Sequence, residues 1–81
     1  MDIESYILIF NSVHRVMRAE KILRDFSVKS KTIPVPRKLS SDCGLAIKVF
    51  EKNVEELKTI LNDEPPEEIY IEEDNNYRRV A

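Results

Sequence analysis

The stretch Tyr6-Ile7-Leu8-Ile9-Phe10-Asn11-Ser12 decides the fold of this 81-residue chain. Its first five residues are aromatic, aliphatic and β-branched in an unbroken run, which is typical of a strand covered on both faces. Such a strand lies at the centre of a sheet. Asn11 and Ser12 break the run, and Ser12 is a favourable N-cap for a helix. The sequence therefore predicts a central strand that leads directly into a helix.

The helix that follows is predicted over residues 13–26. Apolar residues recur there at helical spacing, and the charged residues lie mostly between them, as in an amphipathic helix with one face on a core. The predicted apolar stripe consists of Val13, Val16, Met17, Ala19, Ile22, Leu23 and Phe26. His14 falls beside this stripe, so we expect its side chain to be exposed.

Three further strands and a second helix complete the pattern. Residues 29–35 indicate an edge strand, because Pro34 has no backbone donor. Residues 44–50 alternate between two faces and predict a second good strand. Asn53, with Glu56 three residues later, forms a capping-box pattern for a helix that ends before Pro65-Pro66. Residues 68–72 alternate and carry charged flanks, which are typical of an edge strand.

The order strand, helix, strand, strand, helix, strand predicts an α+β fold. We interpret it as a ferredoxin-like βαββαβ two-layer sandwich with an antiparallel sheet of order 4-1-3-2. Residues 1–73 would form this single domain and residues 74–81 a flexible C-terminal tail. The first strand is apolar on both faces, and the helices cover only one. We therefore expect an exposed apolar patch on the open sheet face, and with it a homodimer.

Composition limits the function. The formal net charge of -2 gives no electrostatic reason to expect nucleic acid as a partner. A single cysteine excludes an internal disulfide and fits a reducing cytoplasm. With one Cys and one His the chain offers no metal site, and no motif indicates a cofactor. The apolar run is too short to span a bilayer and resembles no signal peptide, so we expect a cytoplasmic protein that binds no membrane.

Cys43 is the candidate reactive residue. In the predicted topology it opens the third strand beside the end of the first, and therefore lies near Ser12 and the N-terminus of the first helix. The helix N-terminus carries partial positive charge and unpaired N–H groups, which would stabilise a thiolate. Supporting residues would be Arg37 and Ser41 in the preceding loop, together with Ser12 and His14.

Gly44, the only glycine, follows Cys43 directly and would allow unusual backbone angles or the close approach of a ligand. Two other interpretations stay open for the cysteine. It is equally a small buried hydrophobic residue, since free cysteines are among the most buried residue types. A thiol enzyme would need a second catalytic group, and the sequence offers none at recognisable spacing.

The segment from Ile33 to Arg37, Ile-Pro-Val-Pro-Arg, followed by Ser-Ser-Asp-Cys-Gly-Leu-Ala-Ile at residues 40–47, resembles a family of small prokaryotic proteins described as selenium/sulfur carrier-like. Residues 10–14 and 19–23 resemble the same family, and the resemblance extends from about Tyr6 to Ile71. It implies one reactive cysteine, here Cys43, a cytoplasmic location, and donor and acceptor proteins of sulfur or selenium metabolism as partners.

The leading hypothesis is therefore a carrier rather than an enzyme. Cys43 would accept a sulfur or selenium atom as a persulfide or selenide adduct and pass it on. The alternative is a small interaction or regulatory module in which the cysteine is structural.

Overall fold

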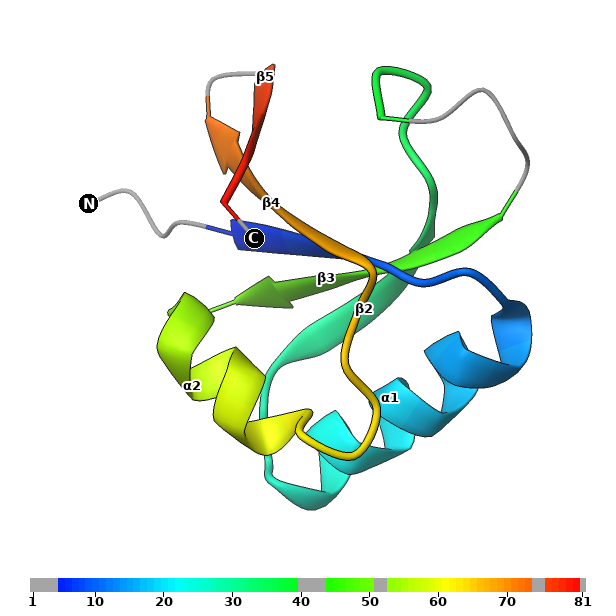
Figure 1. Ribbon diagram of the computed structural model, residues 1–81, viewed down its shortest axis with the longest axis vertical. Helices are drawn as coiled ribbons and strands as arrows, with labels where there is room; N and C mark the ends of the chain where they lie inside the picture. Colours follow the sequence, from blue (N-terminus) through cyan, green and yellow to red (C-terminus); the bar gives the residue numbers. More distant parts are fainter. Residues whose placement is uncertain (1–4, 40–43, 51–52, 74–75, 81) are drawn as a thin grey trace.

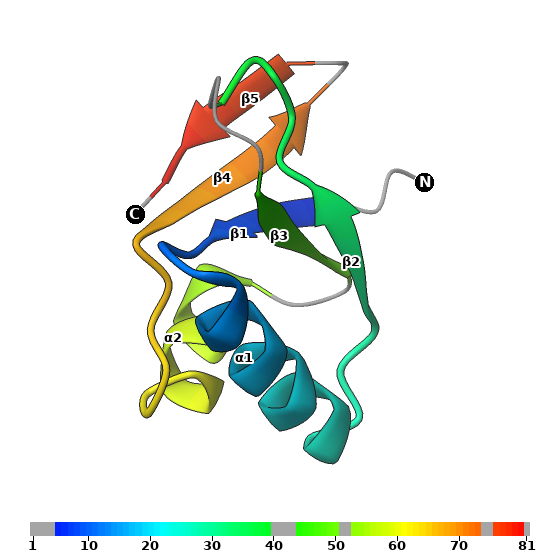
Figure 2. The same cartoon turned by 90° about the vertical axis from the view of Figure 1, so that its right-hand side faces the viewer.

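The computed structural model describes residues 5–39, 44–50, 53–73 and 76–80. The elements are β1 (Ser5–Ile9), α1 (Val13–Asp25), β2 (Ser30–Pro34), β3 (Leu45–Phe50), α2 (Val54–Ile60), β4 (Glu68–Glu73) and β5 (Asn76–Arg79). Both helices lie on one side of a twisted sheet, while the chain that leaves β2 lies on the other side (Figures 1 and 2). The α+β class and the first six elements are as predicted.

The sheet is antiparallel and open, with the strand order β2-β3-β1-β4-β5. The four predicted strands are neighbours in the order 4-1-3-2, but the prediction was wrong in ending the sheet at β4, because β5 pairs outside that strand. The charged flanks of β4 had indicated an edge strand. They form ion pairs with β5 instead, Glu73 with Arg78 at 2.7 Å and Glu68 with Arg79 at 3.1 Å. The ferredoxin-like assignment stays a prediction.

The C-terminal segment was expected to be a flexible tail over residues 74–81, and this was wrong for residues 76–79. These residues pair with β4 from Glu73 opposite Asn76 to Tyr70 opposite Arg79. The Val80 N–H then donates to the carbonyl of Ile69 at 2.8 Å, and Val80 packs against the core. The sequence did not predict β5, because this strand has no alternating apolar pattern. Backbone pairing and ion pairs with β4 hold it in place.

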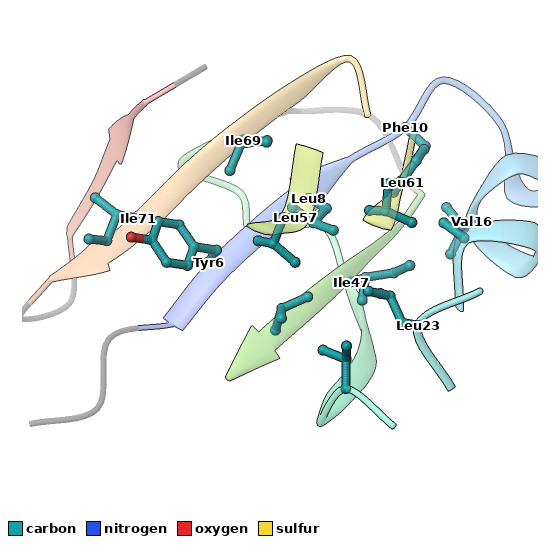
Figure 3. Close-up of a cluster of buried hydrophobic side chains, with 13 residues drawn as sticks. Tyr6, Leu8, Phe10, Val16, Leu23, Ile47, Leu57, Leu61, Ile69 and Ile71 are labelled. Atoms are coloured by element: carbon teal, nitrogen blue, oxygen red, sulfur yellow. The ribbon is translucent and has the colours of Figure 1, made fainter. Parts of the chain in front are cut away.

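The core lies between the sheet and the two helices. Alternate residues of β1 point into it. Leu8 is completely buried beneath Leu57 of α2 and Leu61, the C-cap of α2 (Figure 3). The predicted stripe of α1 is correct for Val16, Ala19 and Leu23, which are buried. It is wrong for Val13, Met17 and Phe26, which are 49, 62 and 61% exposed. The face of α1 that contacts the sheet is therefore narrower than the stripe of apolar residues in its sequence.

Among the residues that the structure describes, the open sheet face carries no exposed large hydrophobic side chain. Ile7 points to this face and is nevertheless completely buried. Its neighbours in the flanking strands are Lys48 and Tyr70. The Lys48 ammonium lies 2.8 Å from Glu72, which also accepts a hydrogen bond from the Tyr77 hydroxyl at 3.3 Å. The large hydrophobic side chains that are exposed in the described residues all belong to α1 and its C-cap. The expected patch was therefore wrong, and the homodimer stays a prediction without that support.

Helix α1 ends in a left-handed turn. Ser27 has a φ of 58°, its N–H donates to Arg24, and the Val28 N–H donates to Leu23. These two bonds form a Schellman motif, in which the left-handed position is usually a glycine.

We predict that Ser27→Gly stabilises the protein by about 0.5–1 kcal/mol, because glycine adopts this conformation without a Cβ clash. Urea unfolding followed by circular dichroism measures the difference. Ser27→Ala retains the Cβ and should give no gain. Equal stability of the glycine and alanine variants would contradict the prediction.

Candidate functional site

Two of the six predicted site residues, Ser41 and Cys43, lie outside the described residues. The other four are described. Ser12 and His14 lie at the start of α1, Arg37 lies in the turn at residues 37–39, and Gly44 directly precedes β3. All four are exposed.

Strand pairing brings three segments to one end of the sheet. Ile9, the last residue of β1, lies opposite Ala46 on one side and Glu68 on the other. The Glu67 N–H donates to the Ile9 carbonyl at 2.7 Å. The N-terminus of α1, Gly44 and the segment that enters β4 therefore share this end (Figures 1 and 2). The predicted neighbourhood of β1, α1 and β3 is correct to this extent.

Ser12 is the N-cap of α1, as predicted. Its φ and ψ are -156° and 155°, and its hydroxyl accepts the Arg15 N–H at 3.3 Å. The Ser12 carbonyl accepts the Val16 N–H at 3.2 Å. Within the described residues, the N–H groups of Val13 and His14 have no hydrogen-bond acceptor. These two donors are the part of the helix N-terminus that remains available to an anion.

Gly44 closes the loop that connects β2 to β3. Its carbonyl accepts the Val35 N–H at 3.1 Å. The expectation of an unusual backbone at Gly44 was wrong, because its φ is not positive. A Cβ added there would lie 3.7 Å from Val35 Cγ2, an ordinary van der Waals distance, and this is the nearest atom among the described residues. The described part of the fold therefore gives no steric reason for glycine at this position.

Arg37 is an exposed cation, and the described residues include no ion-pair partner for it. Neither Arg37 nor Gly44 is hydrogen-bonded to Ser12 or His14 in the part of the chain that the structure describes. The structure thus brings Gly44 and the start of α1 to one end of the sheet on separate segments. The chain that carries Arg37 leaves β2 on the side of the sheet away from the helices (Figures 1 and 2).

Arg15 forms a clamp that the sequence did not predict. Its guanidinium lies 2.8 Å from Glu64 and 2.6 Å from Glu67, and it also donates to the Pro65 carbonyl at 2.8 Å. Arg18 adds a longer contact of 3.5 Å to Glu64. The clamp fixes the segment before β4 against the first turn of α1. The partners are 49 and 52 residues apart in sequence, so no local spacing indicated them.

The clamp changes the electrostatics at this end of the sheet. The hydrogen bond from Arg15 to Glu64 lowers the pKa of the Glu64 carboxyl below its ordinary value. The same hydrogen bond raises the pKa of Arg15. Because Arg15 faces two carboxylates, its charge is compensated locally. Arg15 therefore adds little uncompensated positive charge to the first turn of α1, whereas Arg37 has no ion-pair partner among the described residues.

Residues 5–73 match the family described as "Putative Se/S carrier protein-like". The chain belongs to this Se/S carrier protein-like family. The match extends from β1 to the end of β4, so β5 lies beyond it. Neither the curated proteins nor the solved structures gave a match to the chain.

The described residues contain no cluster of three or more His, Cys, Asp or Glu side chains that could hold a metal ion. Neither of the described helices is long and apolar enough to cross a membrane.

The clamp predicts a dependence of stability on pH. The folded pKa of Glu64 is lowered from 4.5, so its contribution is fully present above the unfolded value and is lost as pH falls through the folded value. We expect Glu64→Gln to lower the Tm at pH 7, and this difference to shrink towards zero on acidification below pH 4.5. Thermal unfolding between pH 3 and 7 measures it.

Asp63→Asn is the matched control, because Asp63 is the adjacent exposed carboxylate and has no ion-pair partner among the described residues. It should change the Tm little. A Tm difference for Glu64→Gln that stayed constant across this pH range would contradict the assignment.

Proposed function

We propose that this protein is a carrier of sulfur or selenium, and that Cys43 holds the transferred atom. Membership of the Se/S carrier protein-like family supports the class of function. The assignment of the cargo to Cys43 rests on its being the only cysteine in the chain. Thiol chemistry of this kind suits a reducing compartment such as the cytoplasm.

The transfer step balances without an external oxidant. The Cys43 thiolate attacks the terminal sulfur of a donor persulfide, and a new S–S bond forms as the donor S–S bond breaks. The donor leaves as a thiolate with the bonding electrons, and the terminal sulfur remains on Cys43 as a persulfide. An acceptor thiolate then repeats the step on this persulfide. The same exchange applies to selenium in place of the terminal sulfur.

The observation that carries this proposal concerns Gly44. It is the only glycine in the chain and follows the only cysteine. It is exposed, its φ is not positive, and a Cβ there would make only an ordinary contact with Val35. A glycine without a structural reason in the described fold fits a position where another molecule must approach the backbone closely. In the carrier, this molecule is the donor or the acceptor.

Charge supports the same proposal. Arg37 is exposed and has no ion-pair partner among the described residues, so its guanidinium is available to an anionic group. At the start of α1, the N–H groups of Val13 and His14 have no acceptor among the described residues, and the His14 side chain is exposed. We propose Arg37, Ser12, His14 and Ser41 as residues that support the thiolate and its adduct.

We predict that Cys43→Ser abolishes loading. The wild-type protein, incubated with glutathione persulfide and freed of small molecules, should release about one equivalent of thiocyanate on cyanolysis, because only a thiolate can accept the sulfur. The serine variant should release none and should retain the circular dichroism spectrum of the wild type. Wild-type protein that holds no sulfur or selenium after such treatment would contradict the carrier proposal.

We predict that Gly44→Ala separates function from stability. The stability of the variant should equal that of the wild type or exceed it by about 0.5 kcal/mol, because the backbone conformation suits alanine. The rate of sulfur transfer from the loaded protein to a thiol-bearing acceptor protein should fall. Denaturant unfolding and the transfer rate are measured on the same preparation. A loss of stability with unchanged transfer would show that Gly44 is structural.

A further inference from the structure

The outer surface of the first two turns of α1 carries an exposed apolar pair, Val13 and Met17. They are 49 and 62% exposed, and their spacing of four residues makes them neighbours on the helix surface. The sequence pattern assigned both to the core, but Val16, Ala19 and Leu23 fill the contact with the sheet. Val13 and Met17 therefore form an apolar surface that the described fold does not use.

The surroundings of this pair are basic. His14 and Arg18 form the adjacent row of the helix surface, and Lys21 lies one turn beyond Met17. His14 and Lys21 are exposed, and the Arg18 side chain is 69% exposed even though it contacts Glu64. The first turn of α1 contains no acidic residue. The nearest carboxylate on the helix surface, Glu20, is held by Arg24 at 2.6 Å.

The position of the pair connects it with the proposed transfer site. Val13 is the first residue of α1, directly after the N-cap, at the end of the sheet that also carries Gly44. The third large exposed hydrophobic residue in the described chain, Phe26, lies beyond the opposite end of the same helix. A protein that reached the neighbourhood of Gly44 along α1 would cover Val13 and Met17 and leave Phe26 free.

We propose that Val13 and Met17, with the basic residues beside them, form the docking surface for the protein that donates the persulfide. This inference rests on the proposed carrier function. Charge complementarity determines the chemistry of the partner: its contact surface is an apolar depression with an acidic rim, next to its own persulfide-bearing cysteine. Methionine suits such a surface, because its flexible side chain adapts to more than one partner.

The test compares two donors. The protein donor is a purified cysteine desulfurase with an acidic surface around its reactive cysteine, charged with radiolabelled cysteine. The small donor is glutathione persulfide, which needs no docking surface. Label on the carrier and cyanolysis measure the loading rate with each donor. The proposal predicts that loading from the protein donor, and not from glutathione persulfide, slows with added salt, because the rim charges attract the partner over distance.

Met17→Glu and Phe26→Glu are a matched pair, since both replace a side chain of about the same exposure, one on α1 and the other at its C-cap. Met17→Glu should slow loading from the protein donor by about tenfold or more, because it removes an apolar anchor and adds a charge that repels the acidic rim. Loading from glutathione persulfide should be unchanged. Phe26→Glu should behave as the wild type with both donors, and Met17→Gln should lie between the two.

The outcomes are distinguishable. If neither donor loads the wild-type protein, the carrier function itself fails. Loading by glutathione persulfide but not by the protein donor would overturn the docking surface and leave the carrier function. Equal rates for Met17→Glu and the wild type, or equal slowing by Met17→Glu and Phe26→Glu, would also overturn it. Circular dichroism and Tm of each variant show whether a slow rate reflects docking or loss of fold.

Discussion

The structure depends on the pairing of β1 along both of its edges. Ile9 lies opposite Ala46 and Glu68, and this register fixes which segments meet at the end of the sheet where α1 begins. A shift of one residue would move the core residues of β1 to the open face and the open-face residues into the core, so the apolar pattern on the helix side holds the register. The N-cap of α1, Gly44 and the entry to β4 are neighbours for this reason.

The charged residues around this end of the sheet differ in their partners. Arg15 is held by Glu64 and Glu67, which compensates its charge and fixes the segment before β4. Arg37, in the turn after β2, and the basic residues on the outer surface of α1 are exposed, and they belong to separate segments of the fold. The paired residues join two segments, and the exposed ones face solvent. A carrier needs both, because the thiol must stay accessible while the segments around it keep their positions.

Sequence reasoning succeeded where a local rule decides the outcome. Ser12 and Asn53 cap the two helices because their side chains accept N–H groups three residues ahead, at 3.3 and 2.8 Å. It failed where partners are distant. No local spacing indicated that Arg15 would pair with Glu64. Met17 was assigned to the core because helical spacing does not show how wide a face of the helix the sheet covers. β5 was not predicted, because it forms a strand by pairing with the edge of β4 and not through an apolar pattern of its own.

The sequence by itself determined the first six elements, their order, the central place of β1, the two caps and the family to which residues 5–73 belong. It also singled out Cys43 and Gly44, because each residue type occurs only once. Only the tertiary structure decided the neutralisation of Arg15, the fifth strand, the covering of Ile7 on the open face and the exposure of Val13 and Met17. Each of these depends on contacts between segments far apart in the chain, and a local pattern of residues carries no information about such distances.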